Sequence, residues 1–494
     1  MLGSVANTLF AAATALFLIP RYVQTAGPRL FGAWSSSGDL LTWLQYFDFG
    51  LTNLLLIKIA AAHGKGDERE VGKILASGAL LTAVGSLLVL ALGVAISFPL
   101  ASWMRVEGAE AEQLRNVFLI ATGASALALF NFVFISFGQG VQRTGYMTFM
   151  ATFSLAVSFA VSFILVTRGF QLYAIAYGLL ARSLVLFAGG VAFIILCRLK
   201  GGLGPLKLDK VHLKEMLHLS PFTMVGGLAY AAMTAMETVL VTVLLSPTLT
   251  TVYVLTRRGA DLCRGLADMV GFASQAGFAH LLASDARKRA LKVFAEINSV
   301  RSAVAFSLAA AYIAANPSLC AVWVGPQFFG GVALTALMGI QMVVGGGAFM
   351  VNYLYRSTGQ IRGGSLLLVV EAVVRIGFAA GLLLWLGLVG IPLAAIITAS
   401  ASSWITFRLL KRQVPEAEPQ SPLVWKALIA QVILVGLAIL VASQVQVASW
   451  LGVIGIGVGF LIMGILISIG LDRNVRSAAT PILKKLRRVE NGTG

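Results

Sequence analysis

Four charged residues of alternating sign share one face of a predicted helix over residues 248–282. Arg257, Asp261, Arg264 and Asp268 stand at i, i+4, i+7 and i+11, and Arg258 is turned about 100° from Arg257. A charged side chain at the centre of a bilayer costs about 2.5–3.5 kcal/mol. Because the surrounding chain is apolar, these side chains must face a polar interior, where an arginine can bind an anion. A membrane bundle with a charged interior usually moves something polar.

Two further arginines, Arg182 and Arg375, lie near the middle of predicted spans. Glu371 precedes Arg375 by four residues, so this pair can instead neutralise itself. Asp261 and Asp268 can likewise do no more than balance the arginines of their own helix. Removing Arg264 and Asp268 together would test that alternative, because a merely structural pair leaves no unpaired charge behind.

Carboxylates inside the predicted spans are candidates for ion coupling. A carboxylate in a low-dielectric environment can exchange a proton or bind a cation, which could couple the protein to a gradient of H+ or Na+. Alternatively, these carboxylates form hydrogen bonds between packed helices or help to make a turn. This alternative applies above all to Asp48, which lies two residues before Gly50. We expect Lys58 and Arg301, near inner helix ends, to reach the membrane surface. The candidates are Asp48, Glu237, Asp261, Asp268 and Glu371.

The elements that position these residues are membrane-spanning helices. Of the 494 residues 58% are hydrophobic and 12% charged, against about 25% charged in soluble domains. Runs of about 20 apolar residues predict an all-α polytopic membrane protein. We predict about fourteen transmembrane helices, over residues 4–20, 38–61, 74–103, 116–137, 144–167, 171–197, 219–245, 248–281, 293–315, 328–354, 363–387, 389–410, 424–446 and 449–471. In the last of these, Gly455 and Gly459 predict a packing face.

Basic residues predict the orientation of these helices. With both termini cytoplasmic, 25 Lys and Arg fall in inside loops and the tail, and 5 fall in outside loops, as the positive-inside rule requires. This topology accounts for the net charge of +17 together with contacts to anionic membrane lipids. We expect no nucleic-acid partner, because no module combines basic and aromatic residues. Residues 482–490 predict a short amphipathic helix on the membrane surface.

A weak internal repeat predicts two lobes. The series Phe31–Trp34, Asp48–Gly50 and His63–Asp67 recurs about 218 residues later as Thr251–Tyr253, Asp268–Gly271 and Ala283–Arg287. Two six-helix lobes around a central cavity are the arrangement of secondary transporters. The predicted parts are an amino-terminal lobe (1–200), a cytoplasmic basic linker (201–218), a carboxyl-terminal lobe (219–415), two extra transmembrane helices (416–472) and a cytoplasmic basic tail (473–494).

Short motifs near the amino terminus resemble those of a known family. They read Leu18-Ile-Pro-Arg21, Gly27-Pro-Arg-Leu-Phe-Gly-Ala-Trp34, Tyr46-Phe-Asp-Phe-Gly-Leu51 and Gly64-Lys-Gly-Asp67. This series resembles Wzx-type polysaccharide flippases, of the superfamily that includes the lipid II flippase MurJ and the MATE drug exporters. Span order and the connection Gln139–Gly145 extend the resemblance over essentially the whole chain. The short basic lead of that family is missing, which would place the true start upstream.

The resemblance implies an alternating-access flippase for a lipid-linked oligosaccharide in the bacterial inner membrane, serving lipopolysaccharide or exopolysaccharide synthesis. Other polysaccharide-assembly proteins are then expected partners. A polyprenyl diphosphate would be bound first by Arg257 and Arg264, with Arg258, Arg182 and Arg375 as further candidates. Apart from charges assigned to the loops and span ends, the clear intramembrane charges are seven basic residues (Lys58, Arg182, Arg257, Arg258, Arg264, Arg301 and Arg375) and five acidic ones (Asp48, Glu237, Asp261, Asp268 and Glu371). This small basic excess favours an anionic substrate.

Other functions remain open beside the flippase. A lipid II flippase or a MATE-like cation or drug antiporter is the nearest alternative, and a membrane polysaccharide polymerase or ligase is a more distant one. The polymerase or ligase would need a large outer loop, and the longest outer loop, near 101–115, is short. No nucleophile–base pair, metal-ligand spacing or phosphate-binding loop is visible, so we expect a non-enzymatic protein without cofactor or metal.

Overall fold

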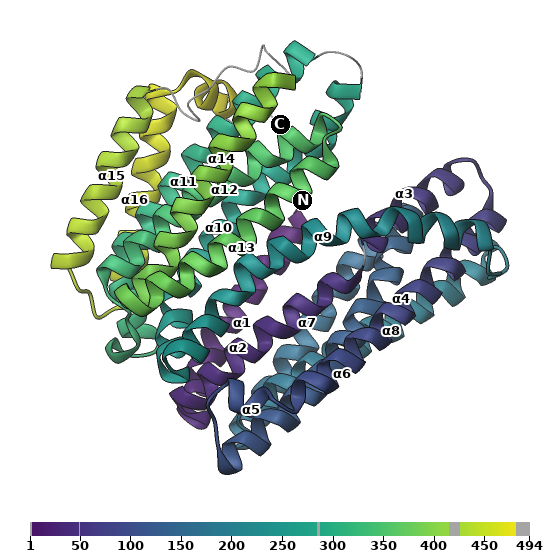
Figure 1. Ribbon diagram of the computed structural model, residues 1–494, viewed down its shortest axis with the longest axis horizontal. Coiled ribbons are helices and arrows are strands. Elements are labelled where there is room, and N and C mark those ends of the chain that lie inside the picture. Colours follow the sequence, from purple (N-terminus) through teal and green to yellow (C-terminus); the bar gives the residue numbers. More distant parts are fainter. Residues whose placement is uncertain (1, 49, 284–286, 414–424, 481–494) are drawn as a thin grey trace, which may run out of the picture. The chain divides into compact units, whose positions relative to one another are not determined.

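The protein folds into α-helices that form two compact units, Met1–Thr251 and Val252–Gly494 (Figure 1). The computed structural model describes residues 2–48, 50–283, 287–413 and 425–480. Within these, it does not describe the side chains of residues 2–9, 11, 47, 48, 53, 219–224, 271–283, 287, 288 and 361. The predicted amphipathic tail helix at 482–490 lies outside the described residues.

Unit 1 is a bundle in which α6 packs against α8 and α4, and α7 packs against α8. Its apolar core lies between these helices and includes the fully buried Phe118, Leu114 and Leu129 of α6. The elements are α1 (Leu2–Ala26), α2 (Pro28–Leu44), η1 (Gln45–Asp48), α3 (Leu51–Gly64), α4 (Glu68–Ser97), α5 (Leu100–Trp103), α6 (Gly108–Gly140), α7 (Thr144–Thr167), α8 (Tyr173–Leu199), α9 (Lys210–Leu240) and the π-turn η2 (Val241–Leu245).

The predicted second span, 38–61, is interrupted. Helix α2 starts at Pro28, runs into the 3-10 turn η1, and gives way to α3 after Gly50. Gly50 has φ 69°, in the left-handed region that glycine adopts at little cost. Asp48 therefore ends a 3-10 turn, not the middle of a continuous helix.

Hydroxyl groups join α2 to α9 inside unit 1. Ser36 shares a short hydrogen bond with Thr242 of η2, and the Thr238 hydroxyl donates to the Asp39 carboxylate at 2.7 Å. Both Ser36 and Thr238 are fully buried. This seam explains why α9, which the sequence assigns to the carboxyl-terminal lobe, packs in unit 1.

Unit 2 is built around the long helix α11, which packs against α16, α15 and α12. Helix α14 packs in turn against α12 and α13, and Figure 1 shows α15 and α16 as neighbouring helices of this unit. The elements are α10 (Pro247–Ala283, of which Val252 onward belongs to unit 2), α11 (Arg287–Trp323), η3 (Pro326–Phe328), α12 (Val332–Ser357), α13 (Ile361–Leu386), η4 (Gly387–Val389), α14 (Gly390–Gln413), α15 (Trp425–Gln444) and α16 (Trp450–Leu471).

The glycine pair predicted as the packing face of α16 does not pack. A methyl group added at Gly455 or Gly459 would meet no atom within 4 Å, whereas one at Gly464 would lie 2.4 Å from the Ser307 hydroxyl of α11. The prediction for Gly455 and Gly459 is wrong, because the contact between α16 and α11 is centred one turn or more further along the helix.

Each predicted span has a helical counterpart, and Ser246 separates η2 from α10. Ten helices within the described residues are long and apolar enough to cross a membrane. Exposed Leu, Ile, Val, Phe and Trp cover the outer faces of α4, α13, α15 and α16, as lipid contact requires. The chain is a multi-pass membrane protein with an all-helical fold.

Candidate functional site

Two arginines of α10 share one carboxylate. The Asp261 Oδ2 atom accepts a hydrogen bond from Arg257 Nε at 3.2 Å, and Asp261 Oδ1 lies 3.5 Å from Arg264 Nη2. Arg257 also stacks on the ring of Tyr253, with 5.5 Å between its guanidinium carbon and the ring centroid. The predicted face thus exists. Arg258 falls on another face of α10, where it is exposed.

A buried polar network holds the turn of α10 that carries Arg257. The Thr256 carbonyl accepts hydrogen bonds from the Tyr312 hydroxyl at 2.9 Å and from Asn316 Nδ2 at 3.3 Å. The Thr256 hydroxyl accepts another, at 2.9 Å, from the Gly330 backbone before α12. Because Thr256, Tyr312 and Asn316 are all buried, these bonds fix the rotation of α10 next to Arg257. Gly259 allows the approach, since a methyl group there would lie 2.8 Å from the Tyr312 ring.

The fourth charge of the predicted face, Asp268, forms an ion pair with α11. Its Oδ1 atom lies 3.9 Å from Arg301 Nη1, and the Arg301 side chain is 1% exposed. The prediction that Arg301 reaches the membrane surface is therefore wrong. Gly346 of α12 makes room for the guanidinium, because a methyl group there would lie 2.3 Å from Arg301 Nη1. The sequence separates Asp268 and Arg301 by 33 positions, so no local pattern indicates the pair.

Three of the other predicted intramembrane residues, Asp48, Arg182 and Glu237, belong to unit 1. In unit 1, Arg182 of α8 is half-buried, and it has no hydrogen-bond or ion-pair partner among the described residues. Glu237 of α9 is buried. The Asp48 side chain lies outside the described residues. Arg182 and Glu237 thus belong to unit 1, whereas the α10 charges belong to unit 2.

Glu371 and Arg375 of α13 form the ion pair that their spacing allows. The Arg375 Nε atom also donates to the Thr398 hydroxyl of α14 at 3.1 Å, and both charged side chains are largely buried. This geometry favours the self-neutralising alternative, because each charge already has a partner.

A polar cluster that the sequence did not indicate joins the start of α9 to α3 and α4. Glu70 lies 2.8 Å from His212 Nε2 and 3.2 Å from Lys73 Nζ. Lys58 pairs with Glu215 at 2.6 Å, so Lys58 does not extend freely to the membrane surface. Half of the predicted linker, from Lys210 onward, is thus the first part of α9.

Hydrogen bonds lower the pKa values of carboxyl groups in this cluster, among them Asp209 and Glu215. The hydrogen bond from the Val211 backbone is the main cause that lowers the pKa of Asp209, helped by His212 and Lys73. The hydrogen bond from Lys58 is the main cause that lowers the pKa of Glu215. Both carboxylates are solvated, so these hydrogen bonds hold the start of α9 locally and add little to the free energy of unfolding of the whole protein. The visible clue was Asp209, a residue type that often caps the start of a helix.

Solved structures with the same fold are membrane transporters. An inward-facing multidrug resistance MATE family transporter of the MOP superfamily matches with a TM-score of 0.63 and 15% identity, covering 84% of this chain and 96% of that one. The lipid II flippase MurJ, in an inward closed conformation, matches with a TM-score of 0.65 and 14% identity, covering 94% and 97%. A MOP superfamily transporter from Pyrococcus furiosus matches with a TM-score of 0.58 and 15% identity, covering 84% and 95%.

The sequence itself matches no protein-family model and no curated protein. At identities of 14–15% the structural likeness establishes the fold, which is the one shared by MATE transporters and MurJ. It leaves the substrate to be argued from the residues of this chain.

Proposed function

We propose that this protein is a flippase that moves a polyprenyl-diphosphate-linked oligosaccharide across the bacterial inner membrane by alternating access. Both termini would be cytoplasmic, and the product would enter polysaccharide biosynthesis. The fold supports a transporter, and the charges on α10 support an anionic headgroup as its cargo.

The excess of positive charge on α10 is the observation that carries the proposal. By sequence the four-residue face is neutral, because two arginines alternate with two aspartates. In the structure Asp268 lies beside the buried Arg301, and Asp261 contacts both Arg257 and Arg264. Helix α10 carries three arginines and two aspartates, since Arg258 adds to the four residues of the face. A diphosphate can neutralise this excess of positive charge with paired hydrogen bonds.

Arg182 strengthens the case for an anionic substrate. A half-buried arginine in a membrane span without a protein partner is costly unless a ligand or water compensates it. Arg375 is a weaker candidate, because Glu371 and Thr398 already bind it. We therefore rank Arg257, Arg264 and Arg182 ahead of Arg375, with Arg258 as an exposed auxiliary.

Asp268 is our first choice for ion coupling. It is 20% exposed and faces a guanidinium that is 1% exposed, so a proton or Na+ that reaches the carboxylate competes directly with Arg301. Glu237, buried in α9, is the second choice. Asp261 and Glu371 are weaker choices, because arginines of their own helices hold both carboxylates.

The extent of the structural match favours a lipid-carrier flippase over a drug exporter. The MurJ match leaves 6% of this chain, about 30 of its 494 residues, uncovered. Helices α15 and α16 together contain 42 residues, 20 and 22 respectively, so at least part of this pair is matched. The MATE match covers only 84% of the chain, so the part that it leaves uncovered is long enough to contain both α15 and α16.

A flipping assay tests the proposal. Purified protein is placed in vesicles with a fluorescent polyprenyl-diphosphate disaccharide, and a membrane-impermeant quencher reports the fraction in the outer leaflet. We expect the protein to accelerate flipping at least tenfold over empty vesicles. Equal flipping with and without protein, or transport of a cationic dye in the same vesicles, would refute the proposal.

A further inference from the structure

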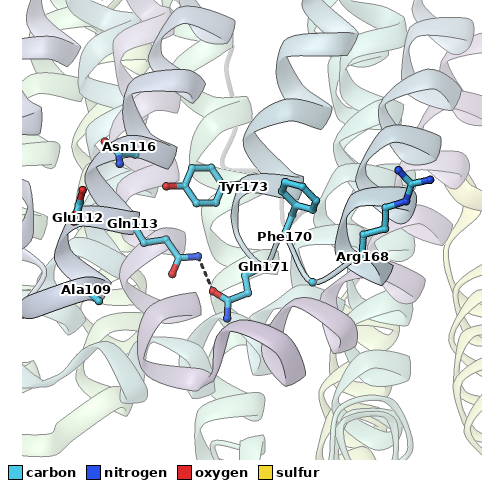
Figure 2. A pocket seen from close by; sticks show the side chains of 9 residues that line it. Ala109, Glu112, Gln113, Asn116, Arg168, Phe170, Gln171 and Tyr173 are labelled. Carbon is cyan, nitrogen blue, oxygen red and sulfur yellow. Dashed lines mark hydrogen bonds between the residues drawn. The ribbon is translucent and has the colours of Figure 1, made fainter.

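A polar hollow of about 430 Å³ lies at one end of unit 1, and none of the charges described above lines it. The first turns of α6 form one side, and the turn between α7 and α8 forms the other (Figure 2). Its volume lies in the range of about 300–1,000 Å³ that is usual for small-molecule sites. The side chains that matter here are Glu112, Gln113 and Asn116 of α6, and Phe170, Gln171 and Tyr173.

The backbone of the turn shapes the hollow. Gly169 has φ 84° and Gln171 has φ 46°, both in the left-handed region. This conformation brings the Gln171 side chain to α6, where Gln113 Nε2 donates to Gln171 Oε1 at 2.7 Å. The bond uses one donor and one acceptor, so an amide oxygen of Gln113 and an amide nitrogen of Gln171 remain for a ligand. Figure 2 shows the Tyr173 hydroxyl directed toward the α6 side of the hollow.

The lining fits a neutral ligand that is rich in hydroxyl groups. Three side-chain amides, a carboxylate and a phenol supply both donors and acceptors, as neighbouring sugar hydroxyls require. The rings of Phe170 and Tyr173 supply flat apolar surface for the C–H face of a pyranose. Arg168 and Glu112 contribute one charge of each sign, so the lining lacks the cation excess that an anionic lipid headgroup would select.

We propose that this hollow binds a sugar unit. The positive-inside rule puts this end of unit 1 on the outer side of the membrane, where a flipped oligosaccharide would emerge. Its role as a contact for the exported glycan rests on the function proposed above, whereas sugar binding by the hollow does not.

Saturation-transfer NMR on the full-length protein in nanodiscs tests the site. The probes are free, lipid-less di- to hexasaccharides of neutral hexose, N-acetylhexosamine and deoxyhexose units. We expect at least one of them to bind, with binding at least tenfold weaker in N116A and in Q171G. Glycine suits the positive φ at position 171, so Q171G removes the side chain and keeps the turn. Y173F, which loses a single hydroxyl, supplies a third variant if either of these fails to fold.

Glu107 lies at the same end of α6 but outside the lining, so E107Q is the matched control and should bind like the wild type. Absence of binding by every saccharide would overturn the proposal. So would equal binding by the wild type and the folded lining variants. Loss of cardiolipin retention in N116A and Q171G, without saccharide binding, would assign the hollow to a lipid headgroup and overturn it as well. Because the probes carry neither lipid nor diphosphate, failure of the flipping assay leaves this result independent.

Discussion

Arg301 of α11 lies with its guanidinium 3.9 Å from the Asp268 carboxylate of α10, and the two side chains differ sharply in exposure, at 1% and 20%. Arg301 Nε and Nη1 have no hydrogen-bond partner among the described residues. Asp268 is therefore the main compensation for a fully buried cation, while Asp268 itself can be hydrated in part. Losing the carboxylate should harm the protein more than losing the guanidinium.

The first prediction compares the two halves of this pair. Breaking a buried ion pair by removing one partner costs about 3–5 kcal/mol, and we expect D268N to lose that amount of unfolding free energy. R301M should lose less, about 1–3 kcal/mol, because the remaining carboxylate reaches water. The double variant should be more stable than D268N alone. Thermal unfolding in detergent measures all three, with the exposed Arg412→Ala as control. Equal losses in D268N and R301M would contradict the asymmetry.

The second prediction concerns neighbouring glycines of α12. A methyl group at Gly346 would lie 2.3 Å from Arg301 Nη1 and 3.2 Å from Asp268 Oδ1, whereas one at Gly345 would meet no atom within 4 Å. Overpacking costs about 1–3 kcal/mol, so G346A should unfold at lower temperature. G345A should be neutral or slightly stabilising, because alanine favours a helix. If both variants shift the unfolding temperature alike, Gly346 is not the space that Arg301 requires.

Hydropathy predicted the membrane helices because burial in lipid dictates long apolar runs. It could not predict the break between α2 and α3, which depends on the left-handed Gly50 and not on hydrophobicity. The sequence also assigned α9 to the carboxyl-terminal lobe, and only its position along the chain supported that assignment. The observed packing follows the buried hydroxyls of Ser36, Thr238 and Thr242, whose hydrogen bonds form only when the helices meet. The central cavity between two lobes stays a prediction.

The candidate site was predictable where its contacts are local. Arg257–Asp261 and Glu371–Arg375 are i, i+4 pairs, so helical spacing was enough. The partner of Asp268 was not predictable, since Arg301 comes from another helix and depends on the space left at Gly346. The sugar-sized hollow was also hidden, because it forms only when the turn at Gln171 meets α6.

The third prediction concerns acid. The pKa values of Asp209 and Glu215 are lowered by their hydrogen bonds to the Val211 backbone and to Lys58, respectively. A carboxyl with a lowered pKa contributes stability that is fully present above its unfolded pKa and is lost as the pH falls through its folded pKa. The start of α9 should therefore stay docked at neutral pH and loosen below about pH 4. Hydrogen exchange of residues 205–216 measures this.

The paired variant D209N/E215Q should already exchange faster at neutral pH and show a weaker acid response. Glu107→Gln, at the opposite end of unit 1, serves as control and should exchange like the wild type. Unchanged exchange of residues 205–216 in D209N/E215Q would show that these carboxylates do not hold the start of α9.

The fourth prediction separates substrate binding by Arg264 from charge balance. The double variant R264A/D268A, which the sequence suggests as a test, is unsuitable, because removing Asp268 would also remove the ion-pair partner of Arg301. Arg264 is 38% exposed and lies 3.5 Å from Asp261, a contact worth at most about 1 kcal/mol. Without Arg264, Arg257 and Asp261 still form a neutral pair.

If Arg264 serves only charge balance, R264A should keep its flipping rate. If Arg264 binds the diphosphate, R264A should keep its unfolding temperature within about 2 °C, yet lose at least tenfold in flipping rate, which corresponds to about 1.4 kcal/mol. R264K should flip the substrate at a rate between those of the wild type and R264A, because lysine keeps the charge and loses the paired hydrogen bonds. R258A, on the exposed face, should flip at a rate closer to that of the wild type. The vesicle assay gives the rates, and a fully active R264A would exclude Arg264 from the substrate site.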